Sequence, residues 1–169
     1  MTHPKRPPPA GATPELLQQG YRYALSLTHD ETRAEDILQD ACVAILRSQG
    51  SWNRGYLFKA IRHRFVDLYR RELVAPMEGI EDSGEVPERV EDAIGSETMV
   101  VNADFLHKAL GRLRVEEREA LFLAAVEGYT AAEIGELTGR PRGTILSLVF
   151  RARRKIDRLA RPREAKDEP

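Results

Sequence analysis

Apolar residues recur at helical spacing along the first seventy positions of the chain, and the stretches begin with helix-start signals. Thr13 before Pro14 predicts a capped helix, because threonine can cap the first turn and proline suits its first position. Asp30 is a second cap candidate, and the helix after it should end near 49–50. The apolar positions of that second helix are Ala34, Ile37, Leu38, Ala41, Cys42, Ile45 and Leu46. A third helix is expected over 54–72, with an apolar stripe made of Leu57, Ile61, Phe65 and Leu68.

The same spacing resumes after Asn102, and the segment before it has a different composition. Residues 74–97 are rich in acids, proline, glycine and serine, so a flexible connection is expected there. No window shows the strict alternation that marks a half-buried strand. The pattern therefore predicts an all-α chain of two small helical domains. They are expected over 12–73 and 101–162, joined by an acidic linker over 74–100, with a disordered tail over 1–11 and a second tail over 163–169.

The most specific motif lies in the second domain. A helix over about 115–126 is followed by Gly128, where a C-terminal cap belongs. Thr130 and Glu133 then form a capping box, in which each residue's side chain satisfies the other's backbone amide. The short helix that they start should stop at Gly139, because glycine readily takes the left-handed conformation that ends a helix.

A tight turn over 140–143 is expected to lead from this short helix into a longer basic one, which completes a helix-turn-helix pattern. At about 100° per residue, the longer helix has two distinct sides. Its core stripe is predicted to consist of Ile145, Val149, Ala152, Ile156 and Leu159. The opposite side carries Ser147, Arg151, Arg154 and Arg158. A polar and basic side is what contact with a DNA groove and its phosphates requires.

Charge is divided into blocks that the net value of −1 conceals. Residues 52–71 net +5 and residues 139–163 net +8, whereas residues 75–104 net −8. Cationic segments attract nucleic-acid phosphates by releasing condensed counterions, whatever the overall charge of the protein. Solvated surfaces without a partner are the alternative interpretation of such blocks. Together with the helix-turn-helix pattern, the charge distribution favours DNA binding.

Composition argues against several other classes of protein. The 169 residues are 41% hydrophobic and 31% charged, without a run of the roughly 18 apolar residues that a membrane span needs. The first residues are polar and proline-rich with no apolar signal core, so a cytoplasmic protein is expected. The single cysteine, Cys42, excludes an internal disulfide, and the four histidines lack metal-ligand spacing. Because no catalytic constellation or phosphate-binding glycine loop is found, we expect neither an enzyme nor a cofactor.

Two separate parts of the chain resemble the sigma-70 family of bacterial transcription factors, in the order that the family has them. Residues 127–134 (EGYTAAEI) and 143–156 (GTILSLVFRARRKI) closely resemble the region 4 helix-turn-helix. Residues 34–40 (AEDILQD) look like the region 2 helix that binds core RNA polymerase, and residues 56–71 look like the promoter −10 helix. About 28 residues separate the two lobes, too few for the extra domain of primary sigma factors. The resemblance is therefore to the extracytoplasmic-function (ECF) group.

This resemblance implies a protein that binds core RNA polymerase, directs it to promoters through −10 and −35 contacts, and leaves catalysis to the polymerase. The implied partners are the clamp helices of the largest polymerase subunit, the polymerase flap, promoter DNA and an anti-sigma factor. The implied polymerase-binding residues, which lie within about one helical turn, are Asp36, Gln39 and Asp40. The implied −10 residues are Trp52, Asn53, Arg54, Lys59, Arg62, His63 and Arg70. The implied −35 residues are Arg140, Arg142, Thr144, Leu146, Ser147, Phe150, Arg151 and Arg154.

Departures from the family pattern leave several roles open. Trp52 provides either a stacking surface for a flipped base or an anchor in the core. His63 stands where the family usually has Asn, and Tyr56 where it usually has Trp, so the −10 sequence preference is undefined. Leu146 and Phe150 are spaced i,i+4 and should be partly exposed. This pair either touches thymine methyl groups, forms a docking patch for an inhibitory partner, or packs locally.

The role of the linker and the function of the chain stay open at this point, whereas Leu148 has one expected location. Leu148, at the edge of the predicted stripe, is expected in the core. The acidic linker is either a solvated tether or a segment that occupies a cationic polymerase channel. The rival functions are a helix-turn-helix regulator that acts without polymerase and a sigma-like decoy that sequesters an anti-sigma factor. The regulator gives no role to the helix that carries Asp36 and Gln39.

Overall fold

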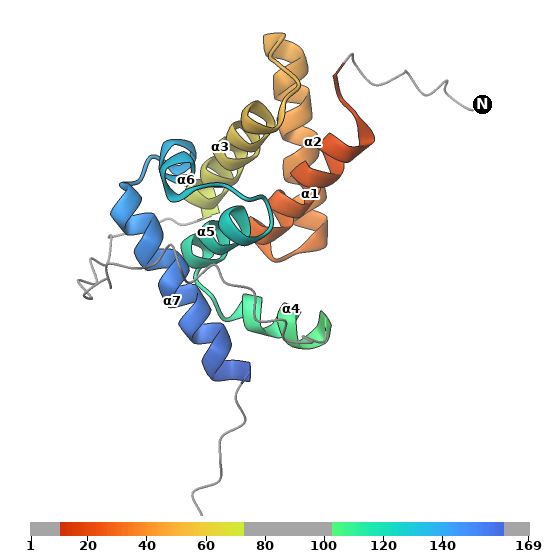
Figure 1. Cartoon of the computed structure of the whole chain (residues 1–169). Helices are drawn as coiled ribbons and strands as arrows, with labels where there is room; N and C mark the ends of the chain where they lie inside the picture. Colours follow the sequence, from red (N-terminus) through yellow and green to blue (C-terminus); the bar gives the residue numbers. More distant parts are fainter. Residues whose placement is uncertain (1–10, 73–102, 161–169) are drawn as a thin grey trace, which may run out of the picture. The chain divides into compact units, whose positions relative to one another are not determined.

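The structure, a computed structural model, describes residues 11–72 and 103–160, and in these ranges every regular element is an α-helix (Figure 1). The helices are α1 (Pro14–Thr28), α2 (Glu31–Ser48), α3 (Arg54–Glu72), α4 (Ala103–Gly111), α5 (Val115–Ala125), α6 (Ala131–Thr138) and α7 (Arg142–Ala160). The chain divides into two units, residues 1–81 and 82–169. The predicted all-α fold with two helical domains is confirmed. The expectations for the linker over 74–100 and for the tails, apart from Gly11, fall outside the described residues.

Side-chain caps start all three helices of the first unit. The side-chain oxygens of Thr13, Asp30 and Asn53 each accept a hydrogen bond from the backbone amide three residues further on, at 3.2, 2.9 and 2.9 Å. The helices α1 and α2 end at His29 and Gln49, whose φ angles of 53° and 52° are left-handed. The caps predicted at Thr13 and Asp30 are confirmed. The cap at Asn53 was not predicted, because that residue was assigned to DNA.

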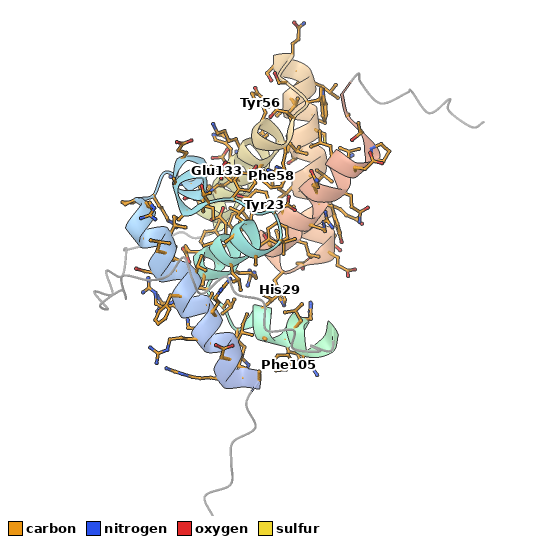
Figure 2. The ribbon with its side chains drawn as sticks, in the orientation of Figure 1. Tyr23, His29, Tyr56, Phe58, Phe105 and Glu133 are labelled. Atoms are coloured by element: carbon orange, nitrogen blue, oxygen red, sulfur yellow. The ribbon has the colours of Figure 1, made fainter. Side chains whose placement is uncertain are left out.

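One face of each helix builds the core of the first unit, in which α1, α2 and α3 all pack against one another. The fully buried side chains include Leu27 of α1, Ile45 of α2 and Ile61 of α3. The rings of Tyr23 and Phe58 stack with centroids 4.5 Å apart (Figure 2). Burial of a large apolar side chain stabilises a fold by about 1.5–3 kcal/mol. Such contacts therefore hold three short helices together with only one side of each.

The second unit contains the expected helix-turn-helix. The Thr130 amide donates to Oε2 of Glu133 at 2.8 Å, and the Glu133 amide donates to Oγ1 of Thr130 at 3.3 Å, so the predicted capping box is confirmed. The helix that it starts ends at Gly139, which is left-handed with a φ of 72°. Gly128 is also left-handed with a φ of 71°, but α5 ends at Ala125 and its cap residue is Val126, two positions before the predicted cap.

The turn before α7 is shorter than predicted. The carbonyl oxygen of Pro141 already accepts the first helical hydrogen bond, from the amide of Ile145 at 3.2 Å, so Gly143 lies inside the helix. The glycine that permits a close backbone contact is Gly135 in α6. A Cβ atom added at Gly135 would lie 2.6 Å from the carbonyl oxygen of Arg140. The turn after α6 can fold back so closely on that helix only because position 135 carries no side chain.

The core stripe of α7 is shorter than predicted as well. Ile145, Val149 and Ala152 are buried, and Leu148 is also buried, as expected. Ile156 and Leu159 continue the same direction, but Ile156 is only half-buried and Leu159 is 37% exposed. The exposure follows because α7 packs against α4, α5 and α6, which are all shorter than α7.

The close approach at position 135 generates a stability prediction. Gly135→Ala should lower the free energy of unfolding by about 1–3 kcal/mol, because the new methyl group meets a backbone carbonyl that cannot easily move. Urea unfolding followed by far-UV circular dichroism measures the change. Gly143→Ala is the matched control, since open space surrounds that helical position and alanine should be neutral or stabilising there by up to about 1 kcal/mol. Equal stability of the two variants would contradict the inferred close approach.

Candidate nucleic-acid interface

The polar residues expected on one face of α2 line a groove in the first unit. Asp36, Gln39 and Asp40 are all exposed. They border a groove of 340 Å³ whose other wall comes from α3 and includes Arg64 and Arg71. The groove therefore has acid and amide groups on the α2 wall, and two cations and one acid, Asp67, on the α3 wall. Such a surface is complementary to a partner that presents charges of both signs.

The same face of α2 becomes apolar toward its C-terminal end. Val43 is 37% exposed and Leu46 is 51% exposed. Leu46 is one of the apolar positions expected on this helix, but it lies outside the buried core. Its helical phase lies at the edge of the stripe, where neither α1 nor α3 covers it. The α2 face thus combines a polar half with an apolar half, and protein–protein interfaces commonly combine both characters.

A second groove lies between the end of α2 and the beginning of α3. It has a volume of 620 Å³ and its lining includes Tyr56 together with the cations Arg47, Lys59 and Arg64. Tyr56 is 40% exposed and projects from α3 (Figure 2). The ring lies against Gly50, where an added Cβ atom would come within 2.5 Å of it. An exposed aromatic face beside cations can stack an unpaired base and neutralise its phosphate.

Sequence reasoning had missed Arg47, Tyr56 and Arg64 as possible binding residues. Arg47 belongs to a different helix from the other two, so helical phase on α3 could not have joined them. The departure of Tyr56 from the family pattern was the available signal.

The other −10 candidates have different surroundings. Lys59, His63 and Arg70 are exposed on α3, whereas Arg62 is half-buried. Nδ1 of His63 lies 3.3 Å from Oδ2 of Asp67, one turn further along the helix. These residues occupy one helix, as their spacing predicted.

The loop before α3 has a structural role of its own. Arg54 is exposed at the first position of α3, and the Asn53 side chain caps that helix. Trp52 is half-buried, and an added Cβ atom at Gly11 would lie 2.9 Å from Cβ of Trp52. The segment before α1 therefore lies directly against Trp52. Gly11, which had been included in the disordered tail, belongs to this contact.

The −35 candidates on α7 differ in how far their side chains are exposed to solvent. Arg142, Thr144 and Arg154 are exposed, whereas Ser147 and Arg151 are half-buried. The hydroxyl of Ser147 donates to the carbonyl oxygen of Gly143 at 3.0 Å. The Nε–H of Arg151 donates to the carbonyl oxygen of Ser147 at 3.4 Å. Both side chains are thus partly oriented by their own helix.

The structure separates Leu146 from Phe150, although both are half-buried. Leu146 lines a cavity of 230 Å³ with Tyr129 and Ile134, so it faces the rest of the second unit. Phe150 instead has the guanidinium carbon of Arg154 at 5.6 Å from its ring centroid. The two side chains therefore have separate environments despite their i,i+4 spacing.

Two cations of the basic C-terminal block pair with acids of α5. The guanidinium of Arg140 lies 3.7 Å from Glu116 and 3.8 Å from Glu119. Nζ of Lys155 donates to both carboxylate oxygens of Glu117, at 2.8 and 2.7 Å. These pairs join residues far apart in the sequence. Helical phase alone could not predict them.

Burial shifts the pKa of three side chains that are not among the candidate binding residues. It raises the pKa of the Cys42 thiol, and with the carboxylates of Glu31 and Glu35 it raises the pKa of Tyr21. Burial also lowers the pKa of Arg118, and the nearby carboxylate of Glu116 partly offsets this effect.

Among the described residues, no cluster of side chains could hold a metal ion. None of the helices described is long and apolar enough to cross a membrane.

Comparison with known proteins agrees with the two-unit arrangement. Residues 15–73 match the family model for sigma-70 region 2, and residues 106–156 match the model for sigma-70 region 4. The ECF RNA polymerase sigma factor ShbA of Streptomyces griseus is 30% identical over 135 residues, which cover 75% of this chain and 71% of ShbA. The ECF RNA polymerase sigma factor SigM of Mycobacterium tuberculosis is 31% identical over 147 residues, which cover 84% of this chain and 71% of SigM.

The chain belongs to the ECF RNA polymerase sigma factors. Members of this family are non-enzymatic transcription factors that direct RNA polymerase to specific promoters. A solved structure supports the fold as well. The sigma factor RpoE of Bartonella quintana, crystallised in complex with the anti-sigma factor NepR, aligns with a TM-score of 0.64 at 24% identity. The alignment covers 86% of this chain and 92% of that one. The family and function implied by the resemblance are therefore confirmed.

The pair between Lys155 and Glu117 in this sigma factor generates a second stability prediction. The Glu117 carboxylate is buried and also accepts the Arg114 amide at 3.0 Å. Lys155→Met leaves that carboxylate without its cation, so the free energy of unfolding should fall by about 1–3 kcal/mol. Thermal and urea unfolding measure the loss. Arg158→Met, at an exposed position on the same helix, is the control and should change stability by less than about 0.5 kcal/mol.

Proposed function

We propose that this sigma factor uses three separate surfaces to start transcription. The α2 face with Asp36, Gln39 and Asp40 docks on the clamp helices of the largest polymerase subunit. The outer face of α3 and the groove beside Tyr56 bind the −10 element, and α7 binds the −35 element. The second unit also contacts the polymerase flap. The protein acts in the cytoplasm, where the polymerase is.

The observation that carries this proposal is the composition of the α2 face. Three exposed polar side chains are followed on the same helix face by the exposed apolar residues Val43 and Leu46. A helix-turn-helix regulator that binds duplex DNA by itself has no use for such a face in its other unit. A large protein partner does, because protein–protein interfaces combine apolar and polar contacts.

Charge reversal on this face tests the docking step. Asp36→Arg combined with Gln39→Ala should abolish co-purification with core RNA polymerase, because a repulsive cation replaces an acid at the interface. Run-off transcription from a promoter upstream of the protein's own gene should be lost in parallel. Far-UV circular dichroism should be unchanged, because both side chains are exposed.

The matched control for this experiment lies on α1. Glu15 and Gln18 are also an exposed acid and amide three residues apart in the same unit. Glu15→Arg combined with Gln18→Ala should therefore leave both readouts close to those of the wild type. Full co-purification of the Asp36/Gln39 variant would overturn the docking assignment.

The groove beside Tyr56 is proposed to receive an unstacked base of the melted −10 element. Stacking on the exposed ring provides binding that tolerates sequence, and Lys59 and Arg64 supply the positive charge that tracks a phosphate. Removing a base from the duplex costs least where pairing is weak. The exposed side chains of Lys59, His63 and Arg70 then contact the adjoining backbone.

Truncation of the ring tests this role. Tyr56→Ala should reduce open-complex formation roughly tenfold, since base–aromatic stacking contributes about 1–3 kcal/mol. Permanganate reactivity of unpaired thymines in the −10 region measures the open complex formed by the reconstituted holoenzyme. Tyr56→Phe retains the ring and should behave like the wild type. A loss of core-polymerase binding by Tyr56→Ala would instead identify Tyr56 as part of the docking surface.

The N-terminal end of α7 is proposed to enter the major groove of the −35 element, as the second helix of a helix-turn-helix does. Arg142 and Thr144 are exposed there, and arginine is the usual reader of guanine. Arg140 has a different proposed role. Its pairing with Glu116 and Glu119 ties the turn before α7 to α5, so it orients the reading helix and does not itself read bases.

The cavity that Leu146 lines is proposed as a contact for an anti-sigma factor. Its lining also includes Tyr129, Ile134 and Arg142. An apolar side chain of an inhibitory protein inserted there would cover the reading end of α7. A sigma factor of the same fold has been crystallised with an anti-sigma factor, which supports a partner of this class.

A further inference from the structure

The surroundings of Arg154 differ from those of Arg140, Lys155 and Arg151. Arg140 and Lys155 pair with carboxylates of α5, and Arg151 donates to a backbone carbonyl. Arg154 is exposed, and in the described part of the chain no carboxylate pairs with it. Its contact is the ring of Phe150, with the guanidinium carbon 5.6 Å from the ring centroid. That distance lies within the range of a cation–π interaction.

A contact with an aromatic ring and an ion pair with a carboxylate affect an arginine side chain differently. A carboxylate occupies the N–H donors of the guanidinium and competes with phosphate for them. An aromatic ring attracts the face of the guanidinium and leaves its five N–H donors directed outward. It also restricts a long side chain that would otherwise lose rotamer freedom when it bound. Arg154 is thus both ordered and available to an anion.

We propose that Phe150 is a positioning residue that holds Arg154 ready for a phosphate of the −35 DNA backbone. This inference rests on the proposed function of α7. It resolves the open role of Phe150, because a ring covered by a guanidinium has less surface for a thymine methyl group. Phe150 then increases affinity for DNA of any sequence, and its effect depends entirely on Arg154. Leu146, which faces a cavity, takes no part in this contact.

Binding measurements on the reconstituted holoenzyme separate these roles. The probes are a duplex from the promoter upstream of the protein's own gene and the same duplex with a scrambled −35 element, each at several KCl concentrations. Phe150→Leu should weaken binding to both duplexes by about two- to fivefold, the range for an exposed cation–π contact. The ratio between the two duplexes should not change. Phe150→Tyr retains the ring and should match the wild type.

Arg154 variants provide the decisive comparison. Arg154→Gln should lower the slope of log K against log salt by roughly 0.9, as expected for one lost phosphate contact. Adding Phe150→Leu to Arg154→Gln should then cause no further loss. Such non-additivity is what a positioning residue shows and what a purely structural residue does not. Circular dichroism of the full-length variants checks that each remains folded.

Several results would overturn the inference. A changed ratio between the two duplexes in Phe150→Leu would make Phe150 a base reader. A two- to fivefold loss that persists in the Arg154→Gln background would show that Phe150 acts without Arg154. An unchanged salt slope in Arg154→Gln would remove the phosphate contact while leaving α7 as the −35 reader. If the wild-type holoenzyme itself did not distinguish the duplexes, the proposed function of α7 would fail instead.

Discussion

A cation in this protein can neutralise a carboxylate of its own chain or remain exposed for a phosphate, and the second unit depends on how its cations are divided between these tasks. The acids of α5 set the division. Glu117 pairs with Lys155, and the two neighbouring acids Glu116 and Glu119 pair with Arg140. These pairs tie the turn before α7 and the C-terminal half of α7 to α5. The exposed cations of α7, such as Arg154, lie outside this network and give the helix its positive outer face.

The sequence allowed the prediction of features that depend on local signals. The caps at Thr13 and Asp30 and the capping box before α6 are hydrogen bonds between residues three positions apart, so the sequence contains both partners. The helices could also be predicted, because an amphipathic helix needs only a regular stripe of apolar residues that its neighbours cover. Leu159 shows the limit of that reasoning, because helical phase gives a direction but not the length of the neighbouring helices.

The candidate site was less predictable for the same reason. Polar and basic faces of α2, α3 and α7 could be assigned from phase, and the residues do lie exposed or half-buried on those helices. The groove beside Tyr56 could not be predicted from helical phase, because it forms only where the end of α2 packs against the start of α3. Nor could the contact between Arg154 and Phe150 be distinguished from an apolar patch that joins Phe150 with Leu146. Each of these depends on a tertiary contact or a rotamer.

The arrangement of α7 explains why recognition by one unit would be weak. The Ser147 hydroxyl already donates to Gly143, and under the proposed function Arg154 contacts backbone phosphate, which leaves mainly Arg142 and Thr144 to read bases. One good bidentate base contact discriminates by only about 1–3 kcal/mol, far below what selection among genomic sites requires. A polymerase that carries both units makes the second promoter contact intramolecular, so two weak selections act together. Specificity is then a property of the holoenzyme, and under the proposed function the docking face on α2 joins the two short reading surfaces to the polymerase.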